Sequence, residues 1–167
     1  MQVIMPELAF FLITLPFSLW AAWTDLSAMR ISNRMNILLF CTFLLSGLIF
    51  LPLAELGLRI GVAFVALAIG FALNAARKLG GGDGKYIAAF IGFVDPREMS
   101  LFFFVLAVCL LAAVVLHRSA KRIGPIRGLV PGWKSWTSKK FPVGLGLSAA
   151  LSLYLAIEAF NLPFAIR

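Results

Sequence analysis

Residues Met99–Leu116 read MSLFFFVLAVCLLAAVVL, a stretch that contains no charged side chain. A helix needs about 20 apolar residues to cross the roughly 30 Å of hydrocarbon in a bilayer, and this run comes close to that length. The whole chain has the same character, because 62% of its 167 residues are hydrophobic and its mean hydropathy is +0.99. A soluble domain is nearer to about 45–50% apolar. The composition therefore excludes disorder, a coiled coil and an ordinary soluble domain, and it predicts a membrane protein with several spans.

Six apolar runs occur along the chain. They cover about Leu8–Trp23, Met35–Leu53, Ile60–Ala76, Tyr86–Val94, Met99–Leu116 and Phe141–Phe164. Five of them approach the length of a membrane span, whereas the run from Tyr86 rises only about 14 Å at about 1.5 Å per residue. That short run either begins earlier, near Gly80, or enters the membrane without crossing it.

The distribution of positive charge decides between these alternatives. The net charge is +8, from 15 basic and 7 acidic residues, and the cytoplasmic loops of membrane proteins carry an excess of Lys and Arg. If all six runs cross, 12 basic residues lie on one side, namely Arg30, Arg34, Arg77, Lys78, Lys85, Arg118, Lys121, Arg122, Arg127, Lys134, Lys139 and Lys140. The other side then holds Arg59, Arg97 and Arg167. If the short run does not cross, the 15 basic residues divide as 7 on one side and 8 on the other. We therefore expect an all-α polytopic membrane helix bundle of about six transmembrane helices, forming a single domain over residues 1–167 with both termini outside.

Two acidic residues lie on the inner side of this bundle, and each is at the end of a span. Asp25 ends the first span, and Asp83 lies in the glycine-rich stretch where the fourth must begin. Irregular backbone at membrane depth persists only where protein buries it or a water-filled cavity lies beside it. Each aspartate taken alone could be a helix cap. Asp25 could cap a short helix that starts at Leu26, and Asp83 could cap the fourth span. Together they favour a carboxylate pair, in which one acid keeps a proton while the other acts as a base, provided that the first and fourth spans meet.

Motifs for other chemistries do not occur in the sequence. The glycine-rich stretch lacks the positions of a phosphate-binding loop, and neither G-x-S-x-G nor H-E-x-x-H is present. The histidine is His117 and the two cysteines are Cys41 and Cys109, so we expect no metal site, disulfide framework or cofactor. The chain is also too apolar for its positive charge to indicate nucleic-acid binding. A membrane protein of this kind could alternatively be a small proton-coupled transporter that uses Asp83 or Glu158 as a relay.

The longest polar segment, His117–Lys140, carries seven of the fifteen basic residues together with Trp133 and Trp136. Basic and aromatic side chains at a membrane surface favour contact with anionic lipid, which is the interpretation we prefer. Docking of a substrate or partner protein is the alternative.

The motifs around the aspartates resemble those of a known family. Gly80-Gly81-Gly82-Asp83 fits the GxGD motif of intramembrane aspartic proteases, and Lys85 fits the GxGD-x-K form of prepilin peptidases. Asp25 with the following Arg30-Ile31-Ser32-Asn33 resembles the first aspartate of that family and its R-x-I-P-N-like stretch. Phe141-Pro142-Val143-Gly144 resembles a late segment that opens the last span. Ser32 in place of proline leaves the shape of its turn open, and Gly84 in place of an apolar residue suggests a more mobile loop.

The resemblance implies an aspartic endopeptidase that cuts the basic leader from type IV pilin-like (prepilin) precursors, usually after a glycine. Asp25 and Asp83 would be the catalytic pair, Gly80 and Gly82 would shape the loop, and Lys85 would bias which aspartate stays ionised. An ordinary lysine at the inner membrane face is the alternative for Lys85. The active site would face the cytoplasm, in the inner membrane of a bacterium, and the precursor protein and the lipid bilayer would be the partners.

The longer enzymes of the family carry a cytosolic segment with paired CxxC motifs, and no such motif occurs in this chain. The chain therefore resembles the short peptidases that serve Flp (tight-adherence) pili, and N-methyltransferase activity is not expected. The sequence leaves the oligomeric state open.

Overall fold

The computed structural model describes residues 6–138, 140–160 and 162. The α-helices within these residues are α1 (Pro6–Ala28), α2 (Asn33–Phe50), α3 (Leu53–Ala75), α4 (Gly81–Phe90), α5 (Met99–Arg122), α6 (Gly124–Leu129) and α7 (Val143–Ala159). Short 3-10 turns occupy Ile91–Phe93, Pro96–Glu98 and Lys134–Trp136. Since the described residues contain no strand, the all-α prediction is confirmed for this part of the chain.

Four segments are long and apolar enough to cross a membrane: α1, α2, α3 and Pro96–Arg122, which contains α5. Helix α7 is apolar but has only 17 residues, and α4 has only 10. The described residues therefore form a membrane helix bundle with four candidate spans and a shorter apolar helix, and the total of six stays a prediction. The expected end of the last run at Phe164, and the charges of Lys139 and Arg167, lie outside the described residues.

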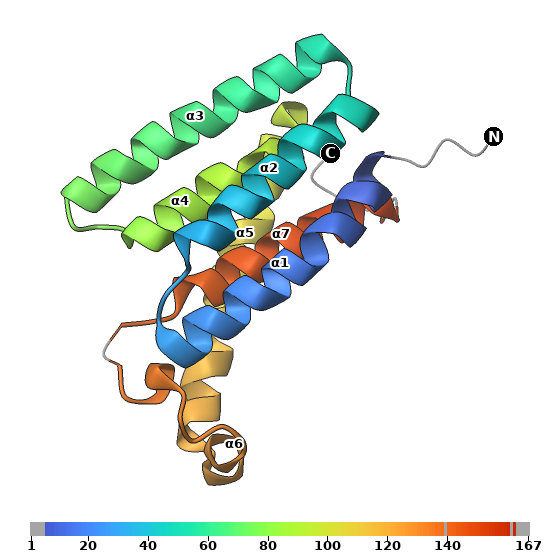
Figure 1. Ribbon diagram of the computed structural model, residues 1–167. Helices are drawn as coiled ribbons and strands as arrows, with labels where there is room; N and C mark the ends of the chain where they lie inside the picture. The colour runs from blue at the N-terminus through green and yellow to red at the C-terminus, as the bar shows by residue number, and fades with distance from the viewer. Residues whose placement is uncertain (1–5, 139, 161, 163–167) are drawn as a thin grey trace.

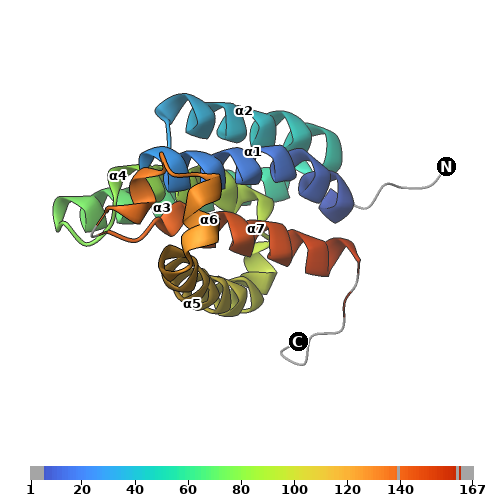
Figure 2. The same cartoon turned by 90° about the horizontal axis from the view of Figure 1, so that it is seen from below.

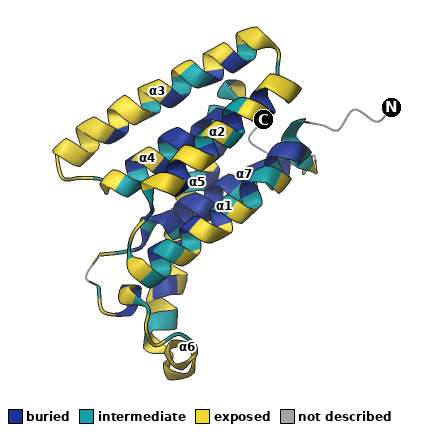
Figure 3. Ribbon diagram, in the orientation of Figure 1, coloured by how far each residue is buried: buried dark blue, intermediate teal, exposed yellow. Residues whose placement is uncertain are grey.

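The bundle has two halves that meet where α4 contacts α7 and where α1 contacts α2 (Figures 1 and 2). In one half, α7 lies between α1 and α5, and a Cβ added to Gly146 of α7 would lie only 3.2 Å from the Cα of Leu110 in α5. In the other half, α4 packs against α3 and α2. The hydroxyls of Tyr86 and Ser148, 3.1 Å apart and buried, join α4 to α7. Figure 3 shows the buried residues on the faces where these helices meet, whereas much of α3 is exposed, as expected for a helix that faces lipid.

Local sequence explains where α2 begins and ends. Ser32 precedes the helix, and its hydroxyl accepts a hydrogen bond from the Met35 N–H at 3.2 Å, which is the interaction of an N-cap. The serine thus gives a defined shape to the turn that the sequence left open. The second apolar run was predicted to reach Leu53, but α2 ends at Phe50, because the residue before Pro52 is forced into extended backbone.

Helices α3 and α4 cross where two glycines face each other. A Cβ on Gly70 would lie 3.0 Å from the Cα of Gly84, and a Cβ on Gly84 would lie 3.1 Å from the Cα of Gly70. Small residues let helices in a membrane approach this closely. The expectation of a mobile loop at Gly84 is therefore wrong, since this residue is buried within α4 at a helix crossing.

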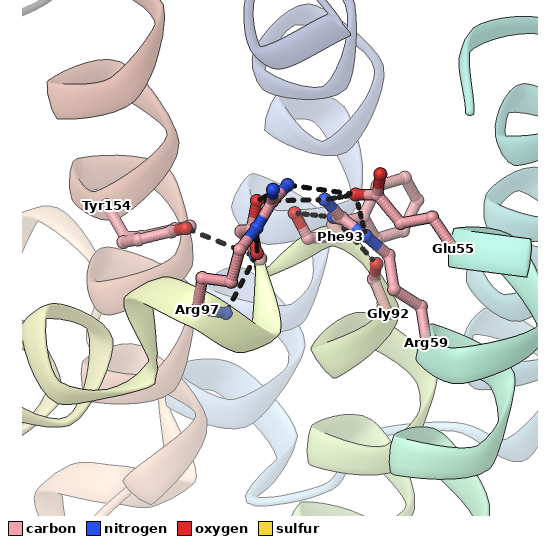
Figure 4. A network of polar contacts seen from close by, with 7 residues as sticks. Glu55, Arg59, Gly92, Phe93, Arg97 and Tyr154 are labelled. Carbon is pink, nitrogen blue, oxygen red and sulfur yellow. Dashed lines mark hydrogen bonds and ion pairs between the residues drawn. The ribbon is translucent and has the colours of Figure 1, made fainter. Parts of the chain in front are cut away.

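A buried arginine closes the far end of the short helix α4 (Figure 4). Nη1 of Arg59, in α3, donates to the carbonyls of Gly92 and Phe93, each at 3.4 Å. These carbonyls lie just after the end of α4, where no further helical turn supplies a donor. Its charge is balanced by Glu55, whose Oε1 accepts from Arg59 Nε at 3.1 Å, and by Asp95, whose Oδ2 lies 3.5 Å from Nη2. This cluster explains why α4 can end within the bundle after only 10 residues.

Candidate active site

Asp25 lies one turn before the end of α1 and is 5% exposed. The hypothesis that it caps a helix starting at Leu26 is wrong, because α1 continues to Ala28. Its carboxylate instead caps a helix that lies far away in the sequence. Oδ2 of Asp25 accepts a hydrogen bond from the N–H of Gly144 at 2.7 Å, across 119 residues. Gly144 lies in the first turn of α7, where free N–H groups and the helix dipole stabilise a negative charge.

The contact between α1 and α7 leaves no room for a side chain at Gly144. A Cβ there would lie 2.9 Å from Oδ2 and 3.1 Å from Cβ of Asp25, and 2.8 Å from Cδ1 of Ile31. The backbone N–H can therefore reach the carboxylate because residue 144 is glycine. The late Phe141–Gly144 segment was noted in the sequence as family-like, but its contact with Asp25 follows only from the structure.

Asp83 lies in the first turn of α4 and is partly buried, just ahead of the apolar run that starts at Tyr86. A Cβ on Gly80, the residue before the helix, would collide with the Asp83 carboxylate. A Cβ on Gly82 would lie 3.3 Å from the backbone oxygen of Ile31. Each of these two glycines thus keeps space clear beside Asp83 or beside the turn that links α1 to α2. The hypothesis that Asp83 is the N-cap of the fourth span is wrong, because Gly80 is the N-cap of α4 and Asp83 lies three residues later, within the first turn.

Both aspartates line one cavity of about 410 Å³, which we call the aspartate cavity. Its wall includes Asp25, Met29, Arg30, Ile31, Asn33, Gly80, Gly81, Gly82, Asp83, Lys85, Lys140, Phe141 and Val143. Helix α1 packs mainly on α7 and α4 mainly on α3, and both aspartates line this cavity without broad contact between α1 and α4. Ile31 was noted in the sequence only as part of a family-like stretch, and its place at the site follows from the structure. It is buried between Gly82 and Gly144, and so it links the two walls that carry the carboxylates.

The two carboxyl groups have different electrostatic surroundings. Asp25 has the N–H of Gly144 as a donor to its charged form. Asp83 lies outside the candidate spans, and burial together with the negative charge of Asp25 raises its pKa to about 6, although the Gly80 N–H acts in the opposite direction. Two nearby carboxyl groups repel each other when both are ionised, so the pair tends to keep one proton. That proton resides on the carboxyl group whose charged form is less stabilised by its surroundings. The arrangement can therefore supply one general base and one general acid.

Lys85 lies at the edge of the aspartate cavity and is exposed. Its Nζ donates to Oδ1 of Asn33 at 3.1 Å, which links the start of α4 to the start of α2. Within the described residues, no ion pair of 4 Å or less joins Lys85 to either aspartate. Among these residues, there is also no group of three His, Cys, Asp or Glu side chains placed to hold a metal ion.

The basic segment after α5 folds back onto the bundle beside the aspartate cavity. Trp136 is 5% exposed and stacks on His117, with ring centroids 5.3 Å apart, and it also stacks on Trp133 at 5.6 Å. Trp133 in turn meets Trp23 of α1 edge to face at 5.4 Å. These contacts anchor the segment, and Lys140 at its end lines the aspartate cavity.

Comparison with known proteins places this geometry in a family. Residues 12–116 match the family model described as the type IV leader peptidase family. The matched stretch contains Asp25, Asp83 and Lys85, whereas Phe141–Gly144 lies beyond it. No curated protein and no solved structure was found to match the chain.

Proposed function

The chain belongs to the type IV leader peptidase family, and from that premise we propose that it is an aspartic endopeptidase with Asp25 and Asp83 as its catalytic pair. Membership of the family implies cleavage of prepilin leader peptides. The observation that carries the proposal is that both carboxyls line one cavity while only Asp25 accepts a hydrogen bond from the start of α7. The substrate is then the leader of a pilin-like precursor, cut where the chain enters the membrane.

The proposed reaction begins with Asp25 ionised and Asp83 protonated. A water oxygen attacks the carbonyl carbon of the scissile amide while Asp25 takes a proton from that water. Asp83 gives its proton to the former carbonyl oxygen, which yields a gem-diol. Asp25 then protonates the amide nitrogen, Asp83 takes a proton from one hydroxyl of the gem-diol, and the C–N bond breaks. The products are a carboxylic acid and an amine, and both aspartates return to their initial states.

Gly80 and Gly82 support this reaction by leaving space beside Asp83 and Ile31. Lys85 positions the start of α4 through Asn33, which supports a structural contribution more than a direct charge effect on the aspartates. The proposed enzyme carries out hydrolysis without N-methyl transfer, as in the short peptidases of Flp pili. Residues 1–167 act as a single membrane-embedded domain in this proposal.

We propose that α4 with its 3-10 turn, and α7, complete a bundle of six spans. The start of α4, which carries Asp83, and the start of α3, which carries Arg59, lie at opposite ends of this bundle (Figure 1). Arg30, Lys85 and Lys140 surround the aspartate cavity, so the excess of basic residues favours the cytoplasmic side of the inner membrane for the end that carries Asp83. Both termini are then outside. The family match favours this peptidase over the proton-coupled transporter.

The decisive experiment compares the purified wild type with the Asp25→Asn and Asp83→Asn variants in detergent. The substrate is a synthetic precursor with a short basic leader that ends in glycine, followed by an apolar segment of about 20 residues. We expect the wild type to release the leader and both variants to lose cleavage. Glu98→Gln removes an acid outside the aspartate cavity and serves as the matched control. Cleavage that survives either aspartate substitution would refute the paired mechanism.

A further inference from the structure

A second hollow lies next to the aspartate cavity, between α2 and α3, with α4 as its floor. It has a volume of about 390 Å³, within the range of about 300–1,000 Å³ that is typical of ligand sites. We call it the lateral groove, and its lining includes Asn36, Phe40, Ala63, Phe64, Leu67 and Ala88. The groove is hollow because alanines form its base: Ala63 and Ala88 are buried, with 3% and 6% exposure.

The lateral groove contains a buried amide that has no partner in the free protein. Asn36 is 5% exposed, and neither its Nδ2 nor its Oδ1 has a hydrogen-bond partner. Buried polar atoms in proteins nearly always have partners, so such an exception requires a physical explanation. A ligand that brings its own donor and acceptor into the groove supplies one.

The groove adjoins the aspartate cavity and opens to the side of the bundle. Asn33 and Lys85 line both spaces, and the hydrogen bond between their side chains lies on the boundary that a polypeptide bound in both spaces must pass. At the outer rim, Ile37 and Phe64 are each 62% exposed, on helices that are long and apolar enough to face lipid. An occupant can therefore enter sideways from the bilayer.

We propose that the lateral groove binds the apolar segment that follows the scissile bond of the substrate, and that Asn36 hydrogen-bonds to this segment. The inference rests on the proposed peptidase function. A basic leader does not fit, because the apolar walls of the groove would leave its positive charges without partners. The groove thus receives the part of the substrate beyond the cleavage site, and the leader stays on the side of the aspartate cavity that faces away from lipid.

The first test fills the groove from its edge. Leu67→Trp enlarges a side chain that lines the groove, and Ile69→Trp is the matched control on the same helix, at a position that is 54% exposed and outside the groove. Two substrates are compared: the synthetic precursor with its apolar segment, and a shortened peptide with the same leader and cleavage site but without that segment. We expect the ratio of kcat/KM for precursor to that for peptide to fall about tenfold in Leu67→Trp, as for one lost contact of ordinary strength. The control keeps the wild-type ratio.

The second test separates binding from folding. Asn36→Leu has nearly the volume of the native side chain and removes an amide that the free protein leaves unpaired. We expect the variant to melt no lower than the wild type, while the KM for the precursor rises about tenfold. A structural role for Asn36 would instead lower the melting temperature and leave the ratio between the two substrates unchanged, which would overturn the proposal.

The third test does not depend on cleavage. A photoreactive residue at position 67 in the Asp83→Asn variant is expected to cross-link to the apolar segment of the precursor in liposomes. Cross-linking to lipid alone would mean that the groove holds acyl chains, and the inference would be wrong. If the wild type cleaves neither substrate, the proposed peptidase function fails by itself, and the cross-link still reports whether the groove binds an apolar segment.

Discussion

Gly144→Ala probes the contact between the first aspartate and the last described helix. The added Cβ would lie 2.9 Å from Oδ2 of Asp25 and 2.8 Å from Cδ1 of Ile31, so the carboxylate must move away from the Gly144 N–H. A hydrogen bond to a charged group contributes about 1.5–3 kcal/mol. If the bond is needed to hold the Asp25 carboxylate in position to take the proton of the attacking water, its loss lowers kcat by roughly 10- to 150-fold.

The assay is leader cleavage from the synthetic precursor by purified protein in detergent, with the melting temperature recorded alongside. Gly61→Ala in α3 is the matched control, since a Cβ there meets nothing within 4 Å. Exchange of glycine for alanine within a helix stabilises it by up to about 1 kcal/mol, so the control should melt at the same temperature or higher and cleave normally. Cleavage by Gly144→Ala at the wild-type rate would refute the assigned role of the α7 N–H. An equal loss in Gly61→Ala would show that the assay reports only general packing.

Three further outcomes follow from the same contacts. Gly80→Ala should abolish most cleavage, because the new Cβ collides with the Asp83 carboxylate. Gly81→Ala should retain cleavage, since its Cβ would come no closer than 3.3 Å to a side-chain amide. Equal cleavage by the two variants would contradict this. The pKa of Asp83 is raised from 3.8 to about 6 in the folded state, so the free energy of unfolding falls as pH rises through this interval. Asp83→Asn should therefore melt above the wild type at pH 8 but not at pH 4. Thermal scans that show the same difference at both pH values would contradict this. Arg59→Met should lower the free energy of unfolding by about 1–3 kcal/mol in a denaturant titration, because buried carbonyls lose their donor. Arg97→Met, with a side chain 78% exposed, should leave the free energy of unfolding nearly unchanged.

The sequence predicts the helical class and the approximate positions of the long spans, because long apolar runs in a membrane protein can form little else. The second apolar run misplaces the helix end, because hydropathy continues through Pro52, whereas the backbone there leaves α2 and begins α3. The apolar run from Tyr86 was recognised as too short to span alone, and its helix was expected to begin near Gly80, which agrees with the start of α4 at Gly81. The means by which it ends inside the bundle could not be predicted, because Arg59 lies in another helix and acts on Gly92 and Phe93 through tertiary contact.

The candidate site shows the same division. Asp25 and Asp83 were selected because acids are few on the basic side of the chain, and that signal is local in the sequence. The partners of these acids are not local. Ile31 is an ordinary apolar residue by composition, and only packing places it between two glycines that face the cavity. Gly84 was interpreted as a source of mobility because it stands in place of an apolar residue. Its neighbour in α3, Gly70, cannot be identified from spacing alone.

The hydrogen bond between Asp25 and Gly144 also has a consequence for the timing of synthesis. Ribosomes add about 5–20 residues per second, so the 119 residues between the two partners take roughly 6–24 s to emerge. During that interval α1 can already be in the membrane while its carboxylate has no α7 to meet. Until α7 arrives, the nascent protein therefore lacks the N–H that binds the Asp25 carboxylate, and the proposed catalytic pair stays incomplete.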